Sequence, residues 1–263
     1  STSAYDIIGG TTSRANITIK NIVLNMSQAA TCIAPAANAW NNTNISNVTF
    51  YLRGTSASQG EAIVLTQANF TLTIENSNFI GAGTPAATNY QDGGTITCAS
   101  GGTGTVNIQN TNASGNIAYT TGVLRIATGC RATLTNVNFT AKANEVLGTD
   151  NVPLLMTTTS TTGFTRIYNS TFYRNGNNTN TESTTAILSL GNNTLISNVT
   201  FGSTKGAADF AIQAATTAAL GNITVTQSRF NDYLRIKLTG AAGTNIRMFD
   251  NSSGTNKGNY YTA

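Results

Sequence analysis

The decapeptide NNTNISNVTF, Asn41 to Phe50, returns as NNTLISNVTF at Asn192 to Phe201, with nine of its ten residues unchanged. Within it lies a shorter pattern: an aliphatic residue, any residue, an amide, any two residues and Phe. The copies of this pattern, some of them imperfect, are IKNIVL (19–24), ISNVTF (45–50), IENSNF (74–79), IQNTNA (108–113), LTNVNF (134–139), IYNSTF (167–172), ISNVTF (196–201) and VTQSRF (225–230). Successive copies begin 26 to 34 residues apart, and such a period is typical of a solenoid, a propeller or an array.

The repeating unit is made of strands. Each copy alternates apolar and polar residues and is rich in β-branched side chains, which indicates a β-strand. A second apolar segment comes before many of the copies, as in YDIIG (5–9), EAIVLT (61–66), GVLRIA (122–127), PLLMT (153–157), AILSL (186–190) and FAIQA (210–214). A propeller blade needs about 40 residues or more, so these shorter units predict one coil each of a parallel β-helix, with two strands a coil. We expect an all-β, right-handed parallel β-helix of about eight to nine coils.

One domain is predicted for residues 1–263. Residues 1–18 are expected to form an N-terminal coil or cap, and residues 231–263 a degenerate C-terminal coil and tail, since terminal repeats are often atypical. In each regular coil the aliphatic residue and the Phe should point inward and stack on their equivalents about 4.8 Å away. The predicted stacked aromatics are Phe50, Phe79, Phe139, Phe172, Phe201 and Phe230.

The conserved place of the amide within the hexapeptide predicts a tight turn. There an Asn side chain can bond both its own backbone and the amide of the next coil. We expect this asparagine ladder to consist of Asn21, Asn47, Asn76, Asn110, Asn136, Asn169, Asn198 and Gln227. Gln227, and Ala113 in place of a Phe, are imperfect rungs. The ladder amides are expected to be buried.

On these motifs the chain resembles the right-handed parallel β-helix superfamily, the pectin-lyase-like group that also contains phage tailspikes and bacterial surface passengers. The resemblance covers nearly the whole chain. It implies the fold, and a surface or adhesin-type member rather than a recognisable enzyme family, because the chain has no adjacent aspartates and no histidine. The shared motif itself assigns no function, since it serves unrelated ones.

Composition limits the function classes. Only 9% of the 263 residues are charged, and the net charge of +4 comes from basic residues that fall singly along the chain, so no nucleic-acid surface is predicted. No apolar run is long enough to span a membrane. Among the three cysteines, Cys98 and Cys130 could pair if they stack, and Cys32 is expected to be a small buried residue. We predict an extracellular or cell-surface location, with the leader absent from this chain.

No catalytic residue, metal site or cofactor is predicted. The chain has no histidine and only ten carboxylates, so histidine-based nucleophile mechanisms lack their base. One acidic row, Asp150, Glu182 and Asp209, could align on three successive coils, with the spacing that inverting glycosidases use. It supports the alternative function, a carbohydrate-binding or polysaccharide-degrading β-helix similar to tailspikes.

Fourteen Asn-x-Ser/Thr triplets are candidate N-glycosylation sites in a secreted chain. Six of the triplets that fall off the ladder are the expected acceptors: Asn25, Asn69, Asn112, Asn138, Asn177 and Asn222. A charge-poor β-solenoid with two open ends predicts an extracellular structural subunit that associates end to end into a surface filament, or an adhesive module, with surface glycans as further partners.

Overall fold

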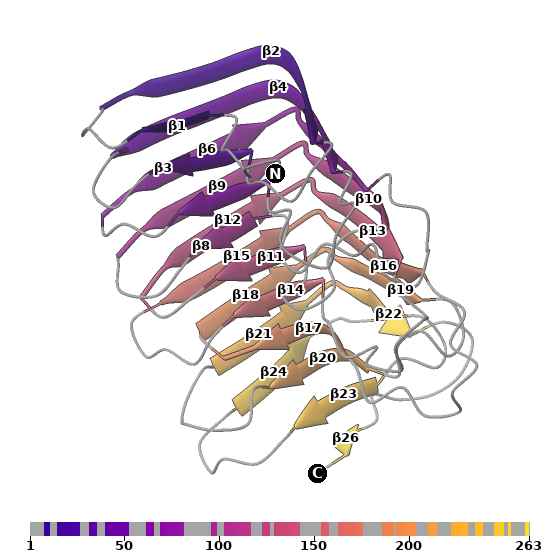
Figure 1. Cartoon of the computed structure of the whole chain (residues 1–263). Helices are drawn as coiled ribbons and strands as arrows, with labels where there is room; N and C mark the ends of the chain where they lie inside the picture. The colour runs from indigo at the N-terminus through magenta and orange to yellow at the C-terminus, as the bar shows by residue number, and fades with distance from the viewer. Residues whose placement is uncertain are drawn as a thin grey trace, which may run out of the picture.

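A computed structural model of the chain consists of stacked β-coils, and every element in its described part is a strand. The described residues are 8–10, 15–26, 32–35, 40–52, 62–65, 69–81, 96–98, 103–116, 123–126, 129–142, 154–157, 163–175, 186–191, 193–203, 210–214, 222–230, 235–238, 245–249, 252–253 and 261–262. Figure 1 shows the strands stacked in rows that advance steadily from the N-terminal to the C-terminal end. The structure is therefore the predicted parallel β-solenoid.

One wall of the solenoid, face 1, is a sheet of ten parallel strands. Its strands follow one another in chain order: β1 (Ile8–Gly10), β3 (Ile33–Pro35), β5 (Ile63–Leu65), β8 (Ile96–Cys98), β11 (Leu124–Ile126), β14 (Leu155–Thr157), β17 (Ala186–Leu190), β20 (Phe210–Ala214), β23 (Arg235–Leu238) and β26 (Tyr261–Thr262). Most of the second apolar segments predicted from the sequence coincide with these strands.

The other sheet has sixteen strands and bends along a corner into two walls, face 2 and face 3. Two long strands, β2 (Ile17–Met26) and β4 (Asn42–Leu52), run through the corner. Face 2 continues with β6 (Thr71–Glu75), β9 (Thr105–Gln109), β12 (Arg131–Thr135), β15 (Phe164–Tyr168), β18 (Asn193–Ser197), β21 (Asn222–Thr226) and β24 (Asn245–Phe249). Face 3 continues with β7 (Asn78–Gly81), β10 (Asn112–Asn116), β13 (Asn138–Lys142), β16 (Thr171–Asn175), β19 (Thr200–Ser203), β22 (Arg229–Phe230) and β25 (Ser252–Ser253).

The prediction of two strands a coil is wrong, because each hexapeptide spans the corner instead of lying on one wall. The strand before the amide belongs to face 2 and the strand after it to face 3. With the strand on face 1, a regular coil has three strands.

The register between coils is preserved although the repeat length varies. Phe50 pairs with Phe79, and Phe139 with Phe172, in unbroken parallel ladders. The Phe50 and Phe79 rings stack with centroids 4.6 Å apart, and the Phe139 and Phe172 rings meet edge to face at 5.5 Å. Such pairs add about 0.5–1.5 kcal/mol each beyond the area that they bury. The predicted aromatic stack is confirmed, and Ala113 is its gap, paired between Phe79 and Phe139.

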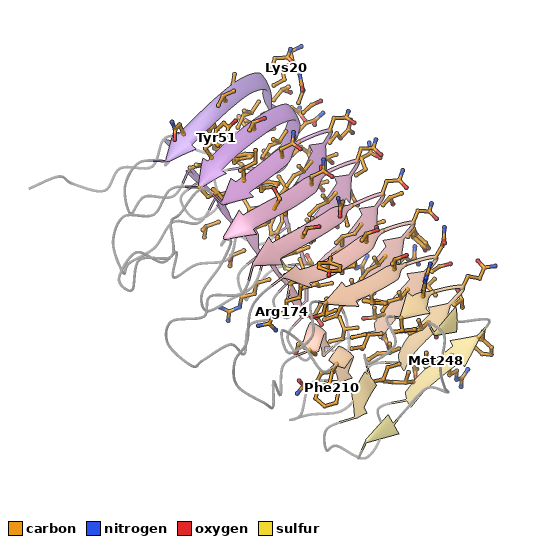
Figure 2. All side chains as sticks on the ribbon, turned by 90° about the vertical axis from the view of Figure 1, so that its right-hand side faces the viewer. Lys20, Tyr51, Arg174, Phe210 and Met248 are labelled. Carbon is orange, nitrogen blue, oxygen red and sulfur yellow. A yellow bond between two sulfur atoms is a disulfide. The ribbon has the colours of Figure 1, made fainter. Side chains whose placement is uncertain are left out.

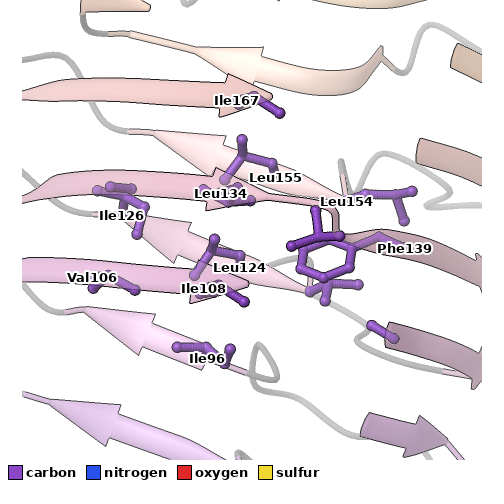
Figure 3. Close-up of a cluster of buried hydrophobic side chains, with 14 of the residues drawn as sticks. Ile96, Val106, Ile108, Leu124, Ile126, Leu134, Phe139, Leu154, Leu155 and Ile167 are labelled. Atoms are coloured by element: carbon purple, nitrogen blue, oxygen red, sulfur yellow. The ribbon is translucent and has the colours of Figure 1, made fainter. Parts of the chain in front are cut away.

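Aliphatic side chains fill the rest of the interior. Ile108, Leu134 and Ile167 form one inward row on face 2. Leu124 and Leu155 pair on face 1 and turn toward this row, as Figure 3 shows. These five residues are at most 1% exposed. The core is thus a continuous column that each coil extends by one layer.

Candidate functional site

The asparagine ladder lies along the corner between face 2 and face 3. All eight predicted amide residues have a left-handed backbone, with φ between 49° and 56°. Asn tolerates this conformation better than other residues with a Cβ. The side chains bond across coils: Nδ2 of Asn47 donates to Oδ1 of Asn21 at 2.9 Å, and Asn136 donates in the same way to Asn110 at 3.1 Å. The ladder and its tight turn are confirmed.

Burial of the ladder was predicted wrongly. Asn47, Asn169 and Asn198 are all exposed, because the left-handed turn directs these side chains outward over the corner. Their hydrogen bonds therefore run along the surface of the solenoid, as between Asn198 and Asn169 at 2.9 Å.

From the second copy of the hexapeptide on, the residue that follows the amide is buried and fills the interior of the corner. The hexapeptide pattern allowed any residue at this position. In several coils this residue is a buried Ser that receives a backbone N–H from the Val of the preceding coil. Ser170 Oγ accepts from Val137 N at 3.1 Å and donates to the Tyr168 carbonyl oxygen at 2.6 Å. Ser77 and Ser228 make the same two bonds. The signal in the sequence was an alternation of Val and Ser at the fourth position of the motif.

The two terminal coils carry the apolar surface of the described residues. Ile22 and Val23 on β2 are 37% and 64% exposed, and Phe249 on β24 is 52% exposed. Among the described strands, β2 pairs only with β4, and β24 only with β21, so each presents an edge. In Figure 2, Lys20 on β2 and Met248 on β24 mark the two ends of the stack. We treat these two ends as the candidate functional surfaces.

The first hexapeptide already contained a signal for this surface. Its fifth position is Val23, whereas every other copy has Thr, Asn or Arg at that position. This position points outward on face 3, where a polar residue is expected. The first coil therefore exposes an apolar side chain next to Ile22, at a position that is polar in the other copies.

Most of the expected glycan acceptors are accessible. Asn25, Asn69, Asn112, Asn138 and Asn222 are exposed. Several of their amides already make polar contacts: Asn112 Nδ2 donates to Asn78 Oδ1 at 3.1 Å, and Asn138 Oδ1 accepts from Thr140 Oγ1 at 3.2 Å. Glycan attachment at these residues stays a prediction, and Asn177 lies outside the described residues.

The acidic row of Asp150, Glu182 and Asp209 also lies outside the described residues. Within the part of the chain that the structure describes, no group of three or more His, Cys, Asp or Glu side chains could hold a metal ion. A shallow hollow on the outer side of β2, β4 and β6 is lined by Asn, Thr and Ile residues, Asn16, Asn42 and Thr71 among them. These side chains offer hydrogen-bonding groups and no titratable group. No described element is a helix long and apolar enough to cross a membrane.

The structure decides the pairing that the sequence left open, and it confirms the burial of Cys32. Cys98, at the end of β8, and Cys130, just before β12, form a disulfide inside the solenoid. Cys32 is a free thiol that is fully buried. Burial disfavours the thiolate and raises the pKa of Cys32 to about 12.

Comparison of the chain with protein-family models, with curated proteins and with solved structures finds no match.

Proposed function

We propose that the chain is an extracellular structural subunit whose copies stack head to tail into a surface filament or an adhesive surface module. One observation carries this proposal: among the described residues, the apolar core rows are only partly covered at both ends of the stack, and these two ends match in register.

The open rows are the inward positions of face 2. Ile17 at the first coil is half-buried, as are Ile246 and Met248 at the last. The strand pairings place Ile17 and Ile246 in the same inward row, and Ile19 and Met248 in the next. A second copy added in this register would set Ile246 against Ile17 and Met248 against Ile19. The core column would then continue from copy to copy.

The asparagine ladder gives this contact a direction. In each of its side-chain bonds, Nδ2 of the later coil donates to Oδ1 of the earlier coil, as between Asn198 and Asn169. Continued past the first coil, the same direction would make Asn21 Nδ2 the donor to a preceding copy. All the described strands pair in parallel, so an added coil matches this pattern only when the last coil of one copy meets the first coil of another. Such a heterologous contact does not close, and a linear polymer follows.

An extracellular location is supported by the covalent chemistry of the chain. Disulfides form and persist in oxidising compartments and are rare in the cytosol, and the Cys98–Cys130 bond lies within the solenoid. A surface of amides and hydroxyls keeps nearly the same charge as the pH changes, which suits a protein outside the cell, where the pH varies.

The proposal is tested with variants that block one end each. Ile22→Lys places a charge at the first coil. Phe249→Lys does so at the last coil, where the register would set the new charge opposite Lys20 of the next copy, and like charges opposite one another repel. Asn138→Lys adds the same charge in the middle of face 3 as a control. Sedimentation velocity measures the size distribution of each protein.

A head-to-tail contact requires a free end of each kind, so each blocked variant alone should stay monomeric and an equal mixture of the two should form dimers. Asn138→Lys should assemble like the unmodified chain. The proposal fails if either blocked variant assembles normally by itself, or if the mixture yields no dimer.

A further inference from the structure

We propose that the outer surface of β12 and β15 binds an oxyanion, a sulfate, phosphate or carboxylate group, between Arg131 and Arg166. The two arginines come from adjacent coils and converge on one aromatic ring. The guanidinium carbon of Arg131 lies 5.3 Å from the centroid of the Phe164 ring, and that of Arg166 lies 4.7 Å from it. This site is separate from the two ends of the stack and does not depend on their association.

The strand register produces this convergence. Arg131 on β12 lies directly opposite Phe164 on β15, and Arg166 follows Phe164 by two residues on the same outer surface. Both arginines are exposed and Phe164 is half-buried. The site is therefore open to solvent, and the flat sheet holds its three side chains at fixed spacings.

The surrounding outer positions supply no counter-charge. On β9 the neighbours are Thr105, Asn107 and Gln109, and on β18 they are Asn193, Leu195 and Ser197. The remaining outer residues of the two strands are Thr133, Thr135 and Tyr168. The one carboxylate on the described outer positions of face 2, Glu75, lies on β6, beyond β9. Among the described residues of face 2, the two positive charges thus have hydrogen-bonding neighbours and no acid beside them.

Phe164 is unusual for its position. Its row on the outer surface has Asn42, Thr71, Thr105 and then Arg131 on earlier coils, and Asn193 and Asn222 on later ones. An aromatic ring replaces a small polar group only where the two arginines flank it. Because cation–π contact orients a guanidinium group, the ring limits the side-chain freedom that each arginine would lose on binding a ligand.

Oxyanions fit this arrangement by chemistry. A guanidinium group is planar, is always charged, and donates two parallel hydrogen bonds to a carboxylate, sulfate or phosphate oxygen pair. Two such groups held beside one ring place two charged donors on the same outer surface, and the nearby amides and hydroxyls can bond the rest of the molecule that carries the oxyanion.

The test is binding of the full chain to immobilised dextran sulfate, with plain dextran as the uncharged reference. Inorganic sulfate, inorganic phosphate and acetate are then added as free competitors, which separates recognition of the ion itself from recognition of the polymer. The variants are Arg131→Gln, Arg166→Gln and Phe164→Leu. Arg229→Gln removes the same charge from an exposed position on face 3 and is the matched control.

We expect binding to dextran sulfate that plain dextran does not show, and competition by at least one of the three free ions. Each arginine variant should weaken binding about tenfold or more, and Phe164→Leu should weaken it because the arginines lose their orientation. Arg229→Gln should change it less than twofold. Equal losses in Arg229→Gln and the site variants would show diffuse charge attraction and overturn the proposal. So would the absence of binding, or site variants that alter thermal stability while binding stays intact, since the arginines would then only cover the ring.

Discussion

The corner of the solenoid leads to a prediction that separates backbone conformation from side-chain bonding. Asn136 has φ of 54°, and its Nδ2 donates to Asn110 Oδ1 at 3.1 Å. Asn136→Ala loses the side-chain bond and places a Cβ residue with no local polar group in the left-handed region. Asn136→Gly loses the same bond and has no difficulty with the backbone.

The loss of stability in each variant follows from the cost of the left-handed backbone and from the lost side-chain hydrogen bond. An L-residue in the left-handed region costs roughly 1–2 kcal/mol, and the exposed amide bond contributes at the lower end of about 0.5–1.5 kcal/mol. Asn136→Ala should therefore lower the free energy of unfolding by roughly 2 kcal/mol. Asn136→Gly should lower it by about 1 kcal/mol, which combines the lost bond with the greater freedom of Gly in the unfolded chain.

The assay is denaturant unfolding followed by circular dichroism, with both variants and the unmodified chain measured under the same conditions. The predicted order of stability is Asn136, then Gly, then Ala. If Gly is as destabilising as Ala, or more so, the left-handed turn is not what selects the amide and the reasoning is refuted.

Two further predictions concern buried groups. Ser170→Ala removes the acceptor of the buried Val137 N–H and should cost about 1–3 kcal/mol in unfolding experiments, whereas the control Thr140→Ala, at a less buried hydroxyl, should stay within about 0.5 kcal/mol; equal effects would contradict the corner network. Cys32 has its pKa raised from 9.0 to about 12, so above pH 9 the unfolded chain loses a proton that the folded chain keeps. The stability that this thiol contributes is intact below pH 9 and is lost as the pH rises toward 12, and Cys32→Ala should flatten that part of the stability curve; an unchanged curve would contradict the burial of the thiol.

The sequence predicted those features that repeat at a fixed place in the motif. The amides were placed correctly in a tight turn because an Asn at the same position in nearly every copy indicates one backbone conformation. Their exposure was not foreseen, because a left-handed residue turns its side chain outward and a strand-like alternation would turn it inward.

Other features depend on which residues of adjacent coils lie opposite one another. This register cannot be read from the sequence directly, because the length of the repeat varies. Arg131 and Phe164 are 33 residues apart in the chain and become neighbours only when β12 and β15 pair. The bond from Val137 to Ser170 likewise joins two coils. Arg131 and Phe164 lie outside the hexapeptides, and Val137 and Ser170 lie in two different copies, so a pattern that scores the positions of one copy does not reveal either pair.

The proposed filament requires the stack to continue from one copy to the next, and electron microscopy of the purified unmodified chain tests this directly. We predict unbranched filaments in which coils follow one another along the axis at about 4.8 Å, without a break where two copies meet. Separate stacks, each of one chain, at every protein concentration would contradict the account.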